Sequence, residues 1–547
     1  MTLAAPAPAG AAPGLARLAP RLIALVAALA VIAPIAGVFL AAGAAGEAWS
    51  HVRTVLLGEY LRATALAVGL ATLGCVLVGA PLAWLVSMTR FPGRGLYEWA
   101  LVLPFAAPAY VAAYAYADLT NAAGPLQSAL RALTGASYGD YWFPETRGLG
   151  GAIFIYVVTL FPYVFLAARA AFTAQSICAL EAARTLGASA RGAFGRVALP
   201  LARPAIAAGA ALAAMEIAAE YGAADHLGAQ TLAVGVFRTW QSLGDLGAAA
   251  RLSLFLVGLA AGLVLIERLA RGRAAFAGGS SRWRAPQRVA LSGLAAWAAS
   301  GACALALLLG FVVPVGWLIV LGLENGPPLR DLAAPLGGSL AIATLGAGSA
   351  LLIAGLAAAA ARTGGRVEQM LAHASTLGYA APGAVVAIGL IGVVAALSGG
   401  STAAMAGPAA IGLLAWAYAA RFAAAGYGPL DAGLTRVTPS LQRAARALGA
   451  RGARRFLAVD LPIALPGLAA AALLVFVEAL KELPATKILR PFNLDTLAVR
   501  AHAYAADERL GAAAWPALLI VAAGLPAVLW ISRGLDRTRA GARKAAA

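Results

Sequence analysis

The sequence predicts an all-α polytopic membrane protein with about twelve transmembrane helices, arranged as two homologous six-helix halves. The 547 residues are 62% hydrophobic and only 12% charged, whereas a soluble domain carries about 25% charged residues. Apolar runs of about 20 residues, long enough to cross a ~30 Å hydrocarbon layer, recur along the whole chain. A polar, arginine-rich segment also occurs twice, at matching places in the two halves.

This repeated segment covers residues 181–204 and 443–466, with an offset of 262 positions between the copies. Ala-Ala-Arg, Leu-Gly-Ala, Leu-Pro and a final proline recur in the same register. Self-similarity at a fixed spacing is typical of duplicated units. We therefore expect a first half at residues 21–267 and a second half at residues 289–532, each with one polar segment on the same side of the membrane.

Each half is expected to contribute six membrane spans. In the first half the apolar segments lie near residues 22–45, 63–86, 97–117, 150–171, 204–220 and 250–267. In the second half they lie near residues 289–321, 339–361, 374–397, 405–425, 465–482 and 511–531.

The connecting stretches indicate the orientation of the chain. Residues 1–20 are rich in Ala and Pro and are expected to be a disordered cytoplasmic N-terminus. Residues 268–288 form a basic linker, and residues 533–547 a basic tail. With the N-terminus in the cytoplasm, most of the 41 Lys and Arg residues fall in cytoplasmic loops, as the positive-inside rule requires. The linker, the C-terminal tail and both repeated segments are then cytoplasmic.

Composition and motifs exclude several functions. The net charge of +18 arises in short loops between spans, so no nucleic-acid partner is expected. The chain has no Gly-rich phosphate loop ending in Lys and no catalytic serine or zinc motif. We therefore expect neither an enzyme acting alone nor a cofactor bound by this chain. The cysteines Cys75, Cys178 and Cys303 are scattered without metal-ligand spacing, and no metal site is assigned.

The Glu-Ala-Ala…Gly…Leu-Pro pattern of residues 181–204 resembles the cytoplasmic loop of the permease subunits of bacterial ABC importers. Two such loops in one chain resemble a fused permease, in which one polypeptide supplies both halves. Further segments resemble the ferric-iron branch of the family: residues 104–114 (PFAAPAYVAAY), 124–127 (GPLQ), 237–240 (FRTW), 478–486 (EALKELPAT) and 489–498 (LRPFNLDTLA). The resemblance implies the type I importer permease fold and a place in the bacterial inner membrane.

In that family the loop forms a short coupling helix that docks into a cleft on the ATP-binding subunit. The resemblance implies that eight residues make this contact: Glu181, Ala182, Ala183 and Gly187 in the first copy, and Arg443, Ala444, Ala445 and Gly449 in the second. Arg443 replaces an acidic residue of the family pattern, so the second contact is expected to differ. The implied partners are two copies of an ABC ATP-binding subunit, which hydrolyse ATP, and a periplasmic ferric-iron binding protein, which delivers substrate.

Ferric iron is the expected substrate. Thiamine, a polyamine or an anion are the alternatives for the same type of permease. A secondary transporter also uses repeats and a midplane site, but it would need no cytoplasmic docking loops. A purely structural membrane scaffold would not need the acidic residues that lie within the spans.

Those acidic residues form two pairs on the helices that follow the repeated segments, which are expected to begin near Pro204 and Pro466. Twelve residues of helix from Pro204 extend ~18 Å, which places Glu216 near the middle of a ~30 Å core. Glu220 would follow one turn further on the same face. The second half repeats the arrangement, and its equivalent residues are Glu478 and Glu482.

An ionisable side chain that faces lipid costs at least ~2.5 kcal/mol, so all four carboxylates are expected to face the interior or water. Pseudo-two-fold symmetry would gather them along one substrate path, where oxygen ligands suit a hard cation such as ferric iron. The alternative is structural: Glu478 and Lys481 could form a salt bridge, and Glu220 and Glu482 could lie at the outer interface. The outer loop at residues 118–149 carries aromatic residues that favour the lipid interface, with contact to a periplasmic partner as the alternative.

Overall fold

The computed structural model describes residues 13–44, 46–174, 192, 194–271, 288–363, 365–399, 407–450 and 452–546. Among these residues, ten helices are long and apolar enough to cross a membrane. They are Pro20–Ala42, Ala48–Met88, Leu149–Thr173, Phe194–Ala219, Leu246–Leu269, Gly293–Asn325, Leu329–Arg362, Pro408–Thr435, Leu457–Leu480 and Leu510–Trp530. The expected all-α polytopic fold is confirmed.

The chain builds this fold almost entirely from helices. Before the linker the elements are α1 (Pro13–Ala42), α2 (Ala48–His51), η1 (Val52–Leu56), α3 (Leu57–Met88), β1 (Thr89–Arg90), α4 (Arg94–Ala100), η2 (Leu103–Ala106), α5 (Ala109–Thr120), α6 (Pro125–Thr134), α7 (Leu149–Ala174), η3 (Phe194–Ala198), α10 (Leu199–Ala219), α11 (Gly222–Leu227), α12 (Leu232–Gln241) and α13 (Leu246–Arg271). After it they are β2 (Val289–Ala290), α14 (Gly293–Leu307), η4 (Leu308–Val312), α15 (Val313–Asn325), η5 (Leu329–Leu332), α16 (Ala333–Thr363), α17 (Arg366–Ala374), η6 (Leu377–Ala380), α18 (Gly383–Leu397), α19 (Pro408–Thr435), α20 (Pro439–Ala447), α21 (Gly452–Arg455), η8 (Phe456–Asp460), α22 (Leu461–Leu480), α23 (Pro484–Leu489), α24 (Leu497–Ala506) and α25 (Leu510–Ala546).

The third expected span of each half is broken rather than continuous. In the first half the chain bends by 90° between Arg94–Ala106 and Ala109–Thr134. The bend lies at Pro108, and the preceding Ala107 is extended with φ −99° and ψ 114°. The second half has the same local geometry at Pro382, where Ala381 has φ −83° and ψ 124°. Proline disfavours helical geometry in the residue before it, so each helix stops and restarts there.

The fifth span of each half begins earlier than expected. α10 begins at Leu199 and α22 at Leu461, each directly after a short π-helix. Pro200 and Pro462 lie in the first turn of these α-helices, just after the π-helical segments. Pro204 and Pro466, the expected starting points, lie inside the two helices.

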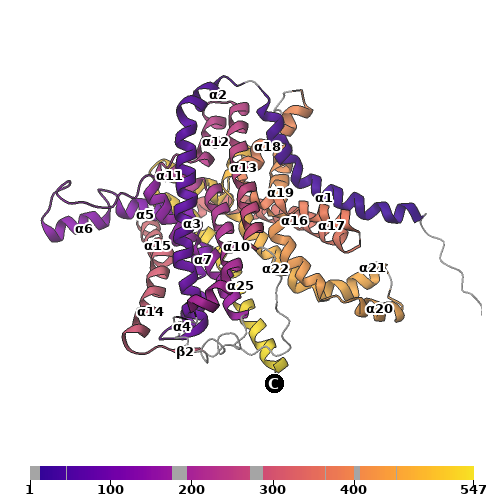
Figure 1. Ribbon diagram of the computed structural model, residues 1–547. Coiled ribbons are helices and arrows are strands. Elements are labelled where there is room, and N and C mark those ends of the chain that lie inside the picture. Colours follow the sequence, from indigo (N-terminus) through magenta and orange to yellow (C-terminus); the bar gives the residue numbers. More distant parts are fainter. Residues whose placement is uncertain are drawn as a thin grey trace, which may run out of the picture.

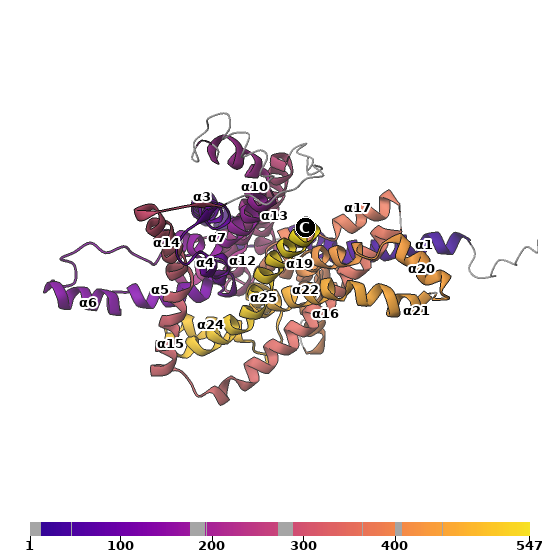
Figure 2. The same cartoon turned by 90° about the horizontal axis from the view of Figure 1, so that it is seen from below.

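The first and last helices each pack on the other half of the chain. α1 packs against α16, α17 and α18, and α25 packs against η2 as well as α15. The long helices α3, α7 and α10 run side by side along the bundle, while α1 crosses toward the later elements (Figures 1 and 2). A two-residue parallel pairing of β1 with β2 ties residues on the two sides of the linker together. The helices that carry the acidic residues are therefore held in an interlocked bundle.

Candidate functional site

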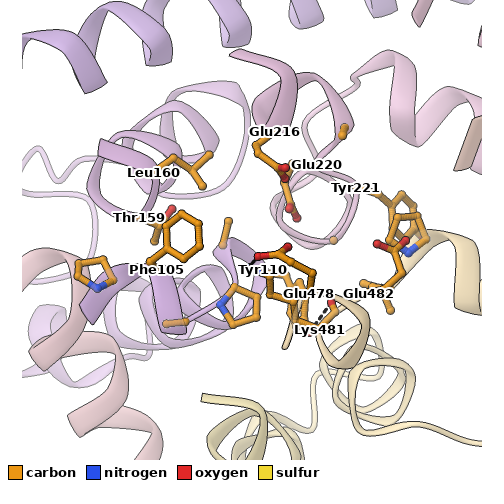
Figure 3. A pocket seen from close by; sticks show the side chains of 18 of the residues that line it. Phe105, Tyr110, Thr159, Leu160, Glu216, Glu220, Tyr221, Glu478, Lys481 and Glu482 are labelled. Carbon is orange, nitrogen blue, oxygen red and sulfur yellow. Dashed lines mark hydrogen bonds and ion pairs between the residues drawn. The ribbon is translucent and has the colours of Figure 1, made fainter. Parts of the chain in front are cut away.

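One pocket brings together all four acidic residues that the sequence singles out. Glu216, Glu220, Glu478 and Glu482 line it, from two segments that lie 262 positions apart in the chain. Figure 3 shows Glu216 and Glu220 facing Glu478 and Lys481 across this pocket. The broken third span supplies part of the wall through Phe105 and its neighbouring prolines. The four carboxylates therefore line a pocket inside the bundle, as the sequence predicts.

Glu220 and Glu482 lie just beyond the ends of their helices. The prediction that each pair of carboxylates shares one face of a continuous helix is therefore wrong. α10 ends at Ala219, and the short helix α11 follows; α22 ends at Leu480, and α23 follows. Glu220 Oε1 accepts a hydrogen bond from the backbone N–H of Ala223, at 2.9 Å. Glu482 Oε1 accepts one from Ala485, at 3.0 Å. Each carboxylate satisfies a free N–H at the start of the following helix, which favours the break.

The cations of the pocket come from the second half alone. Arg421, on α19, forms an ion pair with Glu482. Lys481 Nζ lies 2.8 Å from Glu478 Oε1, which confirms the salt bridge named above as the structural alternative. The same ammonium lies 4.9 Å from the centroid of the Phe105 ring. Glu478 and Glu482 are 7% and 5% exposed, so their cationic partners offset the unfavourable burial of two charges.

Neither carboxylate of the first half forms an ion pair among the described residues, although the charge of Arg421 also attracts Glu220. Among the described residues, Glu216 makes no hydrogen bond or ion pair, and Glu220 has only its backbone bond from Ala223. Thr159 stands in the first half at the place of Arg421, 61 positions before the second carboxylate of its pair, and it also lines the pocket. Ala219 likewise stands at the place of Lys481. The pocket is therefore asymmetric: both carboxylates of the second half form ion pairs, whereas those of the first half, on what we call the open side, form none among the described residues.

Sequence reasoning missed Arg421 and the tyrosines of the pocket. A signal for Arg421 was present, because an arginine inside a predicted span is rare and usually functional. Tyr110 and Tyr221 gave no signal, since aromatic residues are common in apolar helices. Tyr110 OH donates to the carbonyl oxygen of Lys481 at 3.4 Å, and it is 3% exposed.

A buried polar network continues from the pocket and joins the two halves. Lys487 Nζ donates to Tyr221 OH at 3.0 Å, and Tyr221 OH donates to Asp225 Oδ2 at 3.1 Å. His502 Nε2 lies 3.3 Å from the same Asp225 oxygen, and His502 Nδ1 lies 3.0 Å from Tyr114 OH. Tyr114, Tyr221 and Asp225 belong to the first half, whereas Lys487 and His502 belong to the second. This inter-half network fixes α5, α11, α23 and α24 around one side of the pocket.

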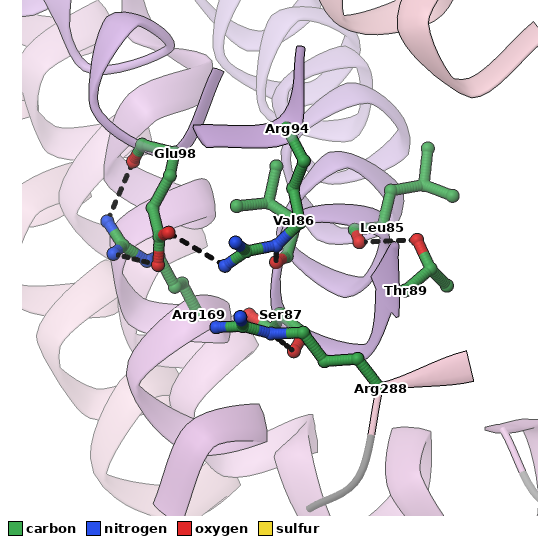
Figure 4. Close-up of polar contacts among 8 residues, drawn as sticks. All are labelled: Leu85, Val86, Ser87, Thr89, Arg94, Glu98, Arg169 and Arg288. Carbon is green, nitrogen blue, oxygen red and sulfur yellow. Dashed lines mark hydrogen bonds and ion pairs between the residues drawn. The ribbon is translucent and has the colours of Figure 1, made fainter. Parts of the chain in front are cut away.

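A separate cluster positions the broken span at its other end (Figure 4). Glu98, on α4, pairs with Arg94 at 2.7 Å and with Arg169 of α7 at 2.8 Å. Arg94 Nε also donates to the carbonyl oxygen of Val86, near the end of α3, at 2.7 Å. Arg169 is 2% exposed, so the cluster ties α4 to two long spans from inside the bundle. It thereby holds in place the segment that carries Phe105 to the pocket.

The second copy of the repeated segment forms a helix and a turn. The helix α20 begins after Thr438, whose Oγ1 accepts a hydrogen bond from the N–H of Leu441 at 3.4 Å. Gly449 follows the helix with φ 84°, a left-handed conformation that stops a helix and favours glycine. Arg443, Ala444 and Gly449 are exposed, whereas Ala445 is 7% exposed. Most of the residues that the resemblance assigns to the ATPase contact in this copy are therefore exposed.

Two exposed leucines on or beside α20 were not selected by sequence reasoning. Leu441 is 42% exposed and Leu448 is 89% exposed. Figure 1 shows α20 and α21 extending from the start of α22, away from the long helices. The corresponding residues of the first copy, Glu181, Ala182, Ala183 and Gly187, lie outside the described residues, so their placement stays a prediction.

Comparison with known proteins places this geometry in a family. The sequence profile described as "Binding-protein-dependent transport system inner membrane component" matches residues 75–271. The Fe(3+)-transport system permease protein FbpB 2 of Haemophilus influenzae is 26% identical, over 86% of this chain and 89% of that protein. A probable molybdenum ABC transporter permease protein of Haloferax volcanii is 34% identical, over 36% of this chain and 69% of that protein. The molybdenum transport system permease protein ModB of Escherichia coli is 30% identical, over 37% of this chain and 88% of that protein.

Proposed function

Because this chain belongs to the binding-protein-dependent transport system inner membrane components, the permease subunits of ABC importers, we propose that it forms the translocation path for ferric iron. The observation that carries the proposal is the pocket in which four carboxylates from two distant segments meet. Carboxylate oxygens are hard ligands and suit a small, highly charged cation. The ferric-iron permease of Haemophilus influenzae, which is similar to this chain over most of its length, supports the same substrate.

An oxyanion such as molybdate is the second candidate, because molybdenum permeases are also similar to part of this chain. Arg421 and Lys481 are the pocket groups that such an anion would need. Both are already paired with carboxylates, and the carboxylates that line the pocket outnumber these two cations. The field in the pocket therefore favours a cation and opposes an anion. Thiamine and polyamines are cations as well and remain the alternatives within this chemistry.

From the asymmetry of the pocket we infer different roles for the carboxylates of its two sides. In this proposal Glu216 and Glu220 contact the passing cation, since neither forms an ion pair among the described residues. Glu478 and Glu482 hold Lys481 and Arg421 and shape the wall. Thr159 and Tyr110 add neutral oxygens beside the open side.

The partners follow from the family and from the exposed cytoplasmic segment. Two copies of an ATP-binding subunit would dock on the repeated segments, with Leu441 and Leu448 adding apolar contacts beside Arg443, Ala444 and Gly449. A periplasmic binding protein would deliver iron at the other face. The chain would lie in the bacterial inner membrane with both termini and the linker at residues 268–288 in the cytoplasm. The two halves would be duplicated units, residues 21–267 and 289–532.

A cysteine in the pocket tests whether substrate passes there. In Ala219→Cys, modification by a small cationic thiol reagent is expected to block ATP-driven iron uptake, because Ala219 lines the open side of the pocket. The matched control is Ala123→Cys on the outer loop, where the residue is exposed and modification should leave uptake unchanged. Complete modification at position 219 with normal uptake would remove the pocket from the path.

A further inference from the structure

The helix α6 (Pro125–Thr134) differs from its neighbours because it leaves the bundle. α5 and α6 form an arm that projects sideways, across the direction of α3 and α7 (Figures 1 and 2). α5 is buried along most of its length, whereas α6 is largely exposed. The arm is the continuation of the broken span, beyond its 90° bend.

The two faces of α6 differ in chemistry. Leu126, Leu130 and Leu133 follow at intervals of four and three residues and therefore share one face. Leu126 is 46% exposed and Leu133 is 86% exposed. Gln127 and Arg131 lie on one flank of the helix, roughly 95° and 135° around the axis from this face. An amphipathic helix of this kind buries its apolar face against another surface.

The polar side chains of α6 already form hydrogen bonds within this chain. Gln127 Nε2 donates to the carbonyl oxygen of Thr120 at 2.8 Å. Tyr141 OH donates to Gln127 Oε1 at 2.9 Å, and Arg131 Nη1 donates to Tyr141 OH at 3.0 Å. These contacts fix the rotation of α6 about its own axis. The apolar face, together with Trp142 at 85% exposed, is turned to the surroundings.

Contacts at both ends of the loop set the depth of α6. Thr120, at the end of α5, shares a hydrogen bond of 2.6 Å with Thr146. Thr146 lies three residues before Leu149, where the span α7 begins. The start of α6 is therefore level with the outer end of a membrane span. A helix that leaves the bundle sideways at this level meets the lipid headgroups.

We propose that α6 is an interfacial helix that lies on the outer leaflet, with Leu126, Leu133 and Trp142 inserted among the lipids. Apolar side chains with a nearby Trp are typical of helices at this depth. Arg131, the one charged residue of α6, is bonded to Tyr141 and points away from the apolar face. The contact would fix the outer end of α5, which carries Tyr110 to the pocket. A lipid surface, rather than the binding protein, is thus the partner of this face.

Site-specific labels in proteoliposomes test the proposal with the full-length chain. Cys75 and Cys303 are buried, so Cys178→Ser leaves a background for single cysteines. An environment-sensitive fluorophore is attached to Leu133→Cys or Leu126→Cys, and to Ser128→Cys on the polar side as the matched control. Quenchers carried on lipid tails near the headgroups are expected to quench the labels at positions 126 and 133 about twofold more than the label at 128. Aqueous iodide should give the reverse order.

Two results would overturn the proposal. One is equal quenching by lipid-borne groups at positions 128 and 133. The other is a label at 133 that iodide reaches freely until the periplasmic binding protein is added, since that would assign the face to protein docking. Two apolar positions are used so that a local disturbance at one leucine does not decide the outcome.

Discussion

ATP-driven iron uptake is expected to fall about 100-fold when Glu216→Gln and Glu220→Gln are combined, since each lost contact to a charged group is worth roughly 1.5–3 kcal/mol and 1.4 kcal/mol is a factor of ten. Both substitutions keep the shape of the side chain and remove charge on the side of the pocket whose carboxylates form no ion pair among the described residues. The measurement is the initial rate of iron uptake by proteoliposomes that contain the complete importer. The fold should survive, because neither carboxylate holds an ion pair among the described residues.

The controls separate the pocket from general effects of charge. Glu324→Gln removes an exposed carboxylate at the end of α15 and should leave uptake unchanged. Glu482→Gln should instead reduce the thermal stability of the protein, because it removes the charge of a buried ion pair with Arg421. Wild-type uptake by the double variant at equal expression would exclude Glu216 and Glu220 from the path.

Transport is also expected to be abolished by Gly449→Trp, while the protein still inserts into the membrane. Gly449 is exposed and left-handed at the end of α20, so a large side chain would disturb both the turn and a closely fitting partner surface. The measurement is retention of the ATP-binding subunit during purification, together with uptake. Both should be lost.

Two variants separate the backbone effect from the docking effect. Gly449→Asn tolerates the left-handed conformation and adds little bulk, so it should keep most of the activity. Gly139→Trp places the same bulk on a left-handed glycine of the loop at residues 118–149, with φ 98°, and should be neutral for ATPase binding. If Gly449→Trp retains its ATPase subunit and transports normally, the docking assignment of this segment is wrong.

The four carboxylates of the pocket could be predicted from sequence because they occupy matching positions in the two copies of the repeat. The offset of 262 pairs Glu216 with Glu478 and Glu220 with Glu482, and the energy of a charge in lipid turns all four inward. The ends of α10 and α22 could not be predicted in the same way. Glu220 and Glu482 are four residues beyond the first carboxylate, a spacing that fits a continuous helix, and only the bonds to Ala223 and Ala485 reveal the break.

The broken third spans show a second limit. Hydropathy is averaged over a window of residues and carries no information about bends in the chain. Residues 97–117 are therefore predicted as one continuous span. Pro104 and Pro108 were visible in the sequence, yet proline is common within membrane helices and by itself does not require a break. Here Pro162 and Pro204 lie inside continuous helices, whereas Pro108 does not. The presence of a proline in an apolar stretch therefore does not by itself tell a broken span from a continuous one.

We propose above that the pocket conducts a cation. The most direct measurement is uptake of radiolabelled ferric iron and of radiolabelled molybdate by the same proteoliposomes, each supplied with its own loaded binding protein and with ATP inside. A cation path through the pocket predicts ATP-dependent iron uptake that falls about 100-fold in Glu216→Gln with Glu220→Gln, and no uptake of molybdate. Uptake of molybdate that persists or rises in the double variant, without uptake of iron, would contradict it.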